Sequence, residues 1–223
     1  STSDVVEATL ARLRPHLRAG QTIIDTGTSD PASSRRIARD LRQSGVAFAD
    51  APLTGGPEQA ERGELGVLCG ADEETFRDLE PLFSSFATTV RHFGPPGSGH
   101  AAKLVSNYLV TGMVALVADA FATARRSGID WRSLYEVMLN GSGNSGVLRK
   151  MVAPALDGDF DGYRFSIANA AKDIGYYARL ADGEGRLTPL AETVAAVFAD
   201  AVETGHGGRN VSHLLDPALD DVT

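Results

Sequence analysis

The sequence contains a single cysteine, Cys69, so no disulfide framework can form and a reducing cytoplasm is the compartment we expect. Its opening residues are polar and lack the apolar core of a signal peptide. No apolar run reaches the roughly eighteen residues that a membrane span needs. The longest apolar segment, from Ala101 to Ala124, is interrupted by Lys103, Asn107 and Asp119. We therefore expect no membrane partner.

Positive charge is also scarce. The 223 residues carry 21 lysines and arginines against 29 aspartates and glutamates, a formal net charge of −8. This balance argues against nucleic acid as a partner. None of the five histidines has the spacing of metal ligands, so no metal site is predicted. Neither a GxSxG nucleophile elbow nor a phosphate-binding GxGxxG loop occurs after a predicted strand.

Strands and helices alternate over the first part of the chain. Short β-branched or apolar runs predict strands at 22–25, 46–50, 65–69 and 89–93. Amphipathic spacing and capping residues predict helices at 5–17, 31–44 and 73–86. This alternation favours a largely parallel sheet covered by helices. Because the chain opens on a helix, we expect the first strands of the sheet to be missing from it.

After residue 93 the pattern becomes entirely helical. Helical periodicity predicts five further helices, at about 98–127, 130–140, 146–157, 167–182 and 189–204. The length of 223 residues is enough for one large domain or two small ones. We predict an α/β domain over residues 1–98 and an all-helical domain over residues 99–223, which opens with a long connecting helix.

The glycine-rich turn before that long helix leads directly into two polar residues. Lys103 and Asn107 are four residues apart and share one face of a helix, with Thr111 one turn further on. Most other positions up to Ala118 are apolar, so we expect the helix to be buried nearly all round. A lysine there could transfer a proton to or from a substrate. Alternatively, its stem packs at a rim while its ammonium reaches water.

Two other segments have both a functional and a plain interpretation. Thr54-Gly55-Gly56 presents consecutive backbone N–H groups that could hold a carboxylate, or it is a tight turn without a ligand. Lys172 and Asp173 lie on a predicted helix, where a solvated charge pair is the plain interpretation.

Together these segments carry a resemblance to a known family. The matching residues are Asp25-Thr-Gly-Thr28-Ser-Asp-Pro31; Asp50-Ala-Pro-Leu-Thr54-Gly55-Gly56 with Ala60, Gly63 and Leu65; Gly94, Gly97, Gly99, Lys103 and Asn107 in a GxxGxGxxxKxxxN pattern; and Phe165 seven residues before Lys172-Asp173. The sequence resembles the β-hydroxyacid dehydrogenases, the family of 3-hydroxyisobutyrate dehydrogenase and tartronate semialdehyde reductase, which is related to 6-phosphogluconate dehydrogenase. The resemblance covers nearly the whole chain.

The resemblance implies a Rossmann-type domain, a long interdomain helix and an all-α domain that builds a homodimer or homotetramer. It implies NAD or NADP as the hydride carrier, and a small β-hydroxy acid or its semialdehyde as the substrate. The activity implied is that of an NAD(P)-dependent oxidoreductase of the 3-hydroxyisobutyrate dehydrogenase type.

The resemblance also assigns roles to individual residues. It implies that Lys103 is the general acid/base and that Asn107 holds the same substrate group. Thr54, Gly55 and Gly56 are implied to bind the substrate carboxylate. It also implies that Thr28, Phe165 and Lys172 bind the cofactor.

The chain departs from the family pattern at several positions. Gly27 and Thr54 stand where the family usually has serine, Asp119 replaces a usual glutamate, and Asn210 stands near a usual aspartate. The family's opening GxGxMG strand–helix units, on the order of 60 residues, have no counterpart here. The glycine loop for the pyrophosphate and the residue that separates NAD from NADP lie in those units. We expect the sequence to be a fragment of the working protein.

Two alternatives remain open at the level of sequence. Imine reductases share this architecture but usually lack the lysine that Lys103 would match. A non-catalytic ligand-binding or dimerisation module of the same fold would keep the acidic surface and the long apolar helix without turnover.

Overall fold

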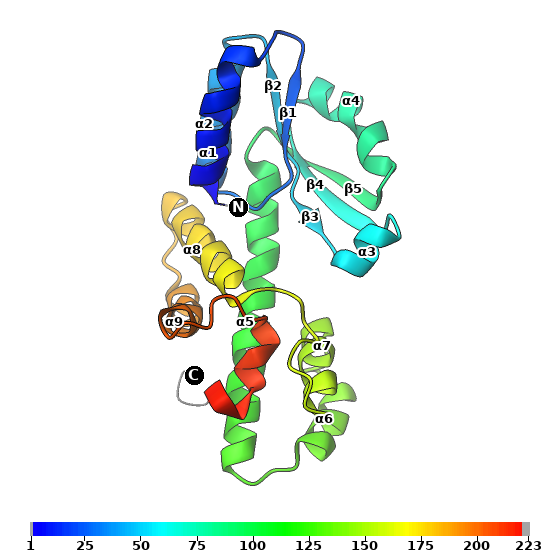
Figure 1. Ribbon diagram of the computed structural model, residues 1–223, viewed down its shortest axis with the longest axis vertical. Helices are drawn as coiled ribbons and strands as arrows, with labels where there is room; N and C mark the ends of the chain where they lie inside the picture. The colour runs from blue at the N-terminus through cyan, green and yellow to red at the C-terminus, as the bar shows by residue number, and fades with distance from the viewer. Residues whose placement is uncertain (1, 220–223) are drawn as a thin grey trace. The chain divides into compact units, whose positions relative to one another are not determined.

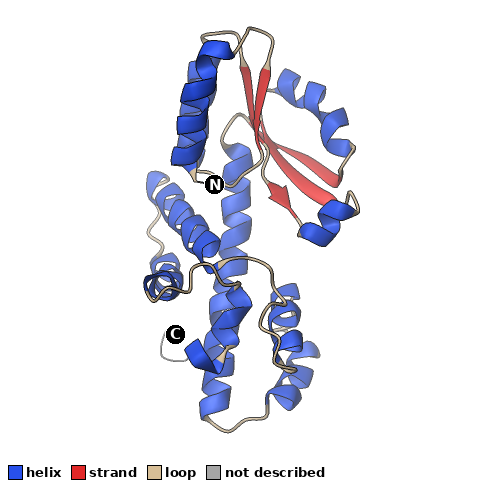
Figure 2. Ribbon diagram, viewed as in Figure 1, coloured by secondary structure: helices blue, strands red, loops and turns tan. Residues whose placement is uncertain are grey.

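The computed structural model describes residues 2–219, and the chain divides into two compact units. The first extends from the N-terminus to Ser106 and includes Arg179–Gly185. The second comprises Asn107–Ala178 and the chain from Arg186 onward. Strands occur in the first unit, and the second is helical (Figure 2).

The first unit is built on a five-stranded sheet whose strands are β1 (Thr22–Asp25), β2 (Ala47–Asp50), β3 (Leu53–Thr54), β4 (Leu65–Gly70) and β5 (Ala87–Gly94). β1 pairs in parallel with β2, and β4 in parallel with β5. β2 and β3 both pair antiparallel with β4. The sheet is therefore mixed, and the prediction of a largely parallel sheet is wrong.

The physical reason lies in the connection between β2 and β4. No strand was predicted between residues 50 and 65, but Leu53–Thr54 forms the short strand β3. The short helix α3 (Pro57–Glu61) follows, and the chain then returns along β3 as β4. A turn of this kind reverses the strand direction, whereas a crossover helix would have kept it parallel.

Helices cover both faces of this sheet. The helices are α1 (Ser3–Leu13) with the short 3₁₀ turn η1 (Arg14–His16), α2 (Pro31–Arg42) and α4 (Glu73–Ser84). Figure 1 shows α1 and α2 on one side of the strands and α4 on the other. The first helix ends earlier than predicted because Pro15 enters the 3₁₀ turn and cannot continue an α-helix. α2 starts as predicted, since the Asp30 side chain accepts a hydrogen bond from Ala32 N ahead of Pro31.

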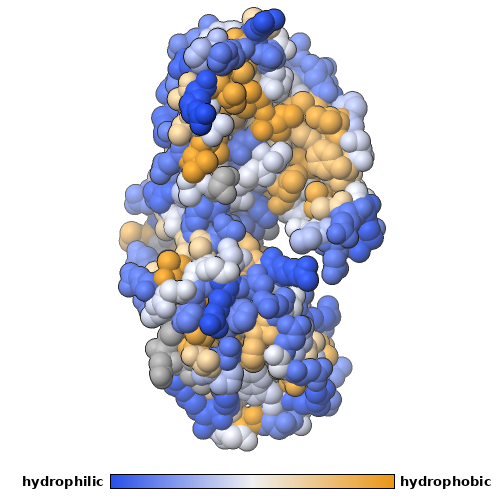
Figure 3. Space-filling view, viewed as in Figure 1, coloured by the Kyte–Doolittle hydropathy of each residue, from blue (hydrophilic) through white to orange (hydrophobic). Residues whose placement is uncertain are grey.

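The larger buried cluster of the first unit lies between the sheet and α4, and a smaller one joins Leu41 of α2 to Val46 and Phe48. Phe83 of α4 is buried together with Val67 and Cys69 of β4. In Figure 3, apolar side chains gather between the strands and α4 on the visible face of this unit. Burial of these side chains is what fixes α4 on the sheet.

The second unit packs around the long helix α5 (Ser98–Arg126), which begins in the first unit. Its other helices are α6 (Trp131–Leu139), α7 (Gly146–Ala155), α8 (Ile167–Gly183) up to Ala178, and α9 (Pro189–Glu203), followed by the 3₁₀ turns η2 (Val211–Leu215) and η3 (Pro217–Leu219). Phe121 of α5, Met151 of α7 and Phe198 of α9 are fully buried in one core. All five long helices were predicted from the periodicity.

One face of α5 is not covered by the described residues, so the expectation of a helix buried nearly all round is wrong. Val105, Leu109 and Leu116 are 56%, 65% and 67% exposed and follow one another at helical spacing. By length and composition α5 could cross a membrane, because an 18-residue stretch of it has a mean hydropathy of 1.6. Of that stretch, 33% is buried inside the protein. However, its opposite face carries Val114, Ala118 and Phe121 in the core, as in a core helix of a folded domain.

The start of α5 approaches the sheet so closely that only glycine fits. A Cβ on Gly99 would overlap the backbone atoms Leu68 O, Asp50 O and Gly70 N. Gly97, with φ +96°, adopts a backbone conformation that other residues rarely reach. These two glycines let the first turn of α5 rest on the ends of β2 and β4.

We predict that Gly99→Ala destabilises the protein by about 1–3 kcal/mol or more, because backbone atoms on three sides must move to admit the methyl group. Gly175→Ala is the matched control, since a Cβ there meets nothing within 4 Å inside α8. It should be neutral or stabilise by about 0.5–1 kcal/mol. Urea unfolding measures both changes, and equal stability of the two variants would disprove the close approach.

Candidate active site

Two aspartates end the parallel strands β1 and β2. Asp25 and Asp50 are direct partners in the register of the two strands, and their exposed fractions are 9% and 0%. Carboxyl groups removed from water in this way need hydrogen-bond partners. Both find them in the loops and helices that start at this edge of the sheet.

Asp50 binds the amino end of α5. Its Oδ1 accepts a hydrogen bond from Gly97 N at 2.6 Å, and its Oδ2 accepts one from His100 N at 2.7 Å. These N–H groups belong to the first turn, where a helix has no internal acceptors for them. Burial raises the pKa of Asp50 to about 7; the two backbone hydrogen bonds oppose this rise, and the negative charge of Asp25 adds to it.

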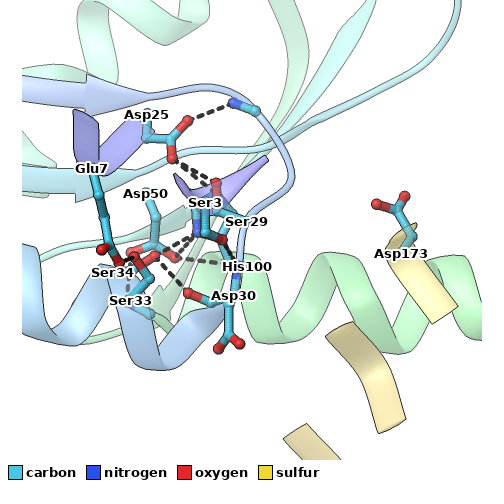
Figure 4. A network of polar contacts seen from close by, with 12 residues as sticks. Ser3, Glu7, Asp25, Ser29, Asp30, Ser33, Ser34, Asp50, His100 and Asp173 are labelled. Atoms are coloured by element: carbon cyan, nitrogen blue, oxygen red, sulfur yellow. Dashed lines mark hydrogen bonds and ion pairs between the residues drawn. The ribbon is translucent and has the colours of Figure 1, made fainter. Parts of the chain in front are cut away.

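His100 lies between the two carboxyl groups and is fully buried (Figure 4). Its Nε2 is 3.8 Å from Asp25 Oδ2, and its Nδ1 is 3.8 Å from Asp50 Oδ2. Ser34 of α2 places its Oγ 2.7 Å from Nδ1. Asp25 also accepts hydrogen bonds from Gly27 N and Ser29 Oγ. We call Asp25, His100 and Asp50 the buried triad.

The sequence analysis did not single out the buried triad. The available signals were two aspartates at the ends of predicted strands and a histidine directly after the glycine-rich turn. Their proximity depends on the register of β1 with β2 and on the place where α5 contacts the sheet. Neither can be derived from the sequence pattern.

The other predicted residues of the first unit lie on three elements. Lys103 is partly buried on α5, one turn beyond His100. Thr28 follows the carboxyl end of β1, and Thr54 ends β3. Gly55 has φ +105°, as the predicted glycine turn requires. Gly56 N donates a hydrogen bond of 2.9 Å to Gln59 Oε1, so this chain supplies an acceptor for one N–H of the predicted carboxylate nest.

Asn107 and Lys172 meet in the second unit through Asp173. Asn107 Nδ2 donates a hydrogen bond of 2.6 Å to Asp173 Oδ2, and Lys172 Nζ lies 3.1 Å from Asp173 Oδ1. The side chains of Lys172 and Asp173 are 16% and 3% exposed. Their interpretation as a solvated pair is therefore wrong, and Asp173 is a candidate site residue that the sequence analysis left without a role.

Aromatic rings hold α8 against α5 around this group. Tyr108 of α5 stacks on Tyr177 of α8 with 4.0 Å between ring centroids. The Lys172 ammonium lies 5.6 Å from the centroid of the Tyr176 ring, within the range of a cation–π interaction. Phe165 packs against the helical core, beside Tyr163. The Tyr176 ring and the Asp173 carboxylate are thus the contacts that orient the Lys172 side chain.

Other kinds of chemistry find little support in the described residues. Within residues 2–219, no group of three or more histidines, cysteines, aspartates or glutamates could hold a metal ion. Cys69 is buried, and burial raises the pKa of its thiol to about 12. A thiol held in its neutral form is a poor nucleophile.

A nicotinamide cofactor fits the donors at this edge of the sheet. Ligands of open α/β sheets bind beyond the carboxyl ends of parallel strands, and β1 and β2 end here. The loop after β1 is small and polar, with Thr28 partly exposed at its centre. Thr28 thus lies at the edge where a ligand of this sheet would bind, and its contact with the cofactor stays a prediction.

Comparison with known proteins decides the family. Residues 97–218 match the model described as NAD-binding of NADP-dependent 3-hydroxyisobutyrate dehydrogenase. Residues 1–94 match the NAD binding domain of 6-phosphogluconate dehydrogenase. The chain belongs to the β-hydroxyacid dehydrogenase family. The predicted family and the Rossmann-like domain followed by a helical domain are thereby confirmed, and the cofactor is NAD or NADP.

Individual relatives of this family member are similar over most of its length. The NAD-dependent L-serine dehydrogenase of Pseudomonas aeruginosa is 29% identical over 92% of the chain and 72% of that protein. The 2-(hydroxymethyl)glutarate dehydrogenase of Eubacterium barkeri is 30% identical over 89% of the chain and 66% of that protein. The chain thus spans about two thirds of the length of such relatives.

A solved structure extends the comparison to three dimensions. The 3-hydroxyisobutyrate dehydrogenase of Mycobacterium tuberculosis with L-serine has a TM-score of 0.84 and 26% sequence identity to this family member. The match covers 96% of this chain and 75% of that one.

We predict that Asp50 makes the stability depend on pH. The pKa of Asp50 is about 7 in the folded protein and near its ordinary 3.8 in the unfolded chain. The folded state therefore binds the proton more tightly between these values, and the free energy of unfolding falls as pH rises from about 4 to about 7. The slope contributed by Asp50 is at most about 1.4 kcal/mol per pH unit.

Urea unfolding at a series of pH values measures this slope. Asp50→Asn should flatten it between about pH 4 and pH 7, because the amide does not titrate. Asp78→Asn, on the exposed side of α4, should keep the slope of the unmodified protein. An unchanged slope in Asp50→Asn would show that Asp50 ionises normally.

Proposed function

We propose that the protein is an NAD(P)-dependent dehydrogenase that interconverts a small β-hydroxy acid and its semialdehyde or keto form. The observation that supports this most strongly is the pair Lys103 and Asn107 on consecutive turns of α5. A titratable amine and an oriented amide on one helix face are suited to a single substrate oxygen. Asp173 accepts one N–H of the Asn107 amide at 2.6 Å, which fixes the amide and leaves its second N–H to donate to the substrate oxygen.

In the oxidation direction, Lys103 takes the proton from the substrate hydroxyl and Asn107 holds the same oxygen. Thr54, Gly55 and Gly56 bind the substrate carboxylate, and Gly56 N does so by exchanging its hydrogen bond to Gln59 Oε1 for one to the carboxylate. A nicotinamide cofactor would supply the hydride acceptor for the carbon that bears the hydroxyl. In the reverse direction Lys103 returns the proton to the carbonyl oxygen. Exact positioning of reacting groups supplies a large part of the rate in such reactions.

Lysine, rather than arginine, is the residue this role requires. The sequence contains only three lysines, Lys103, Lys150 and Lys172, among 21 basic residues. An arginine cannot give up its proton in a protein, whereas the pKa of a lysine responds to its surroundings. In a chain that otherwise uses arginine, lysines at 103 and 172 support acid/base work and cofactor contact at these positions. Thr28 and Phe165 complete the proposed cofactor contacts.

The names of the relatives indicate the substrate class. They include dehydrogenases of L-serine, L-threonate and 2-(hydroxymethyl)glutarate, each a carboxylate that also carries a hydroxyl group. A small polar hydroxy acid is therefore the proposed substrate, and the cytoplasm the proposed location. Thr54 and Gly27 are the residues that we expect to determine the choice among such acids.

The exposed face of α5 supports self-association, and we propose a homodimer or homotetramer formed through the helical unit. Val105, Leu109 and Leu116 present an apolar row along the helix. Apolar rows of this kind are normally covered, and a second copy of the chain presents the same row for a symmetric contact.

We predict that Lys103→Ala lowers kcat by roughly 10²–10⁴-fold, because the proton of the substrate hydroxyl loses its acceptor. The measurement is NAD- or NADP-linked turnover of a hydroxy-acid panel by the full-length gene product. Lys150→Ala, on the exposed side of α7, is the matched control and should keep its rate. Full turnover by a folded Lys103→Ala variant would remove Lys103 from the mechanism.

We predict that replacing Leu109 and Leu116 together by glutamate converts the oligomer to monomers, because four buried charges would face each other in a symmetric contact. Light scattering after size exclusion measures the mass. Leu82→Glu, 51% exposed on α4 of the first unit, should leave the mass unchanged. A Leu109→Glu, Leu116→Glu variant that stays oligomeric would place the interface elsewhere.

A further inference from the structure

His100 of the buried triad and Lys103, the residue proposed to move the proton, lie one turn apart on α5. His100 and Lys103 are three residues apart on α5, so their Cβ atoms are about 5–6 Å apart on neighbouring helix positions. The imidazole of His100 contacts three elements, β1 through Asp25, β2 through Asp50 and α2 through Ser34. These contacts on three sides limit the movement of the ring within the first turn of α5.

The charge of the triad is set by few groups. Those that face Asp50 are Asp25 from β1, His100 from α5 and Cys69 from β4, while α2 contributes the uncharged Ser34. Burial keeps the thiol of Cys69 neutral, since its pKa is raised to about 12. Burial also raises the pKa of Asp50 to about 7. The triad as a whole can thus gain or lose a proton near neutral pH.

We propose that His100 is a positioning residue for Lys103, and that the buried triad sets both the direction and the proton affinity of the Lys103 amine. A unit of charge gained or lost within about 8 Å, at an effective dielectric constant of about 20, changes the proton affinity of an amine by roughly tenfold or more. The catalytic part of this inference rests on the proposed function of Lys103; the electrostatic part does not.

The reactivity of the Lys103 amine tests the proposal without any turnover. Acetic anhydride acetylates the unprotonated amine, and mass spectrometry of peptides reports the modified fraction of each lysine. Lys150 serves as the internal reference within the same molecule because it lies on α7, exposed to solvent. The Lys103-to-Lys150 ratio is measured from pH 6 to pH 9 in the full-length gene product.

His100→Gln keeps a side chain that can hydrogen-bond to Ser34 but cannot take up a proton. We expect it to change the Lys103-to-Lys150 ratio at pH 7 by roughly tenfold and to alter the pH at which the ratio rises. His92→Gln is the matched control, since His92 on β5 contacts Ala71 O and Phe76 outside the triad. It should leave the ratio unchanged.

Ser34→Ala is the second variant. It removes only the group at 2.7 Å from Nδ1 and should change the ratio in the same direction by a smaller factor, even where His100→Gln fails to fold. An unchanged ratio in a folded His100→Gln variant, or in Ser34→Ala, would overturn the proposal and leave the triad with a purely structural role.

Kinetics separate this inference from the proposed function. In an active enzyme, His100→Gln should lower kcat about tenfold and shift its pH profile, with the KM for the cofactor unchanged, because the change acts through Lys103. Absence of turnover in the unmodified protein with every substrate and both cofactors would disprove the proposed function. The acetylation ratio would still decide whether the triad controls the Lys103 amine.

Discussion

The carboxyl group of Asp50 on the first N–H groups of α5 is the contact on which the candidate active site depends. It attaches the helix that carries Lys103 to the end of a sheet strand. This contact requires the first residues of α5 to pack directly against the backbone of β2 and β4. Gly97 and Gly99 allow this close approach. His100 then fills the space between Asp50 and Asp25, with one ring nitrogen 3.8 Å from an oxygen of each carboxyl group and Ser34 Oγ 2.7 Å from Nδ1.

Much of the fold follows from local sequence. Proline and aspartate mark the start of α2 at Asp30-Pro31, and Gly45 ends the segment with φ +67°. The five long helices of the second part were evident from their period, and the family motifs identified the Rossmann-like and helical architecture correctly. The proposed boundary between the domains at residues 98 and 99 stays a prediction.

The features that escaped prediction depend on contacts between distant segments. The mixed sheet follows from a two-residue strand, Leu53–Thr54, too short to produce a periodic signal. The burial of Lys172 and Asp173 depends on α8 packing against α5, which a single helical pattern cannot reveal. The exposed row on α5 is an apolar pattern that looks the same in sequence whether a core or a second chain covers it. The roles of Lys103, Asn107 and the other site residues likewise stay predictions.

The sole cysteine has a further consequence. Cys69 sits on β4 next to Gly70, whose backbone abuts the Asp50 carboxyl, and its side chain is fully buried. A thiol-specific reagent can reach it only when the middle of the sheet opens. The rate of thiol modification would therefore measure how often the sheet opens at the point where α5 is attached to it. Because the sequence has one cysteine, the signal comes from that single position.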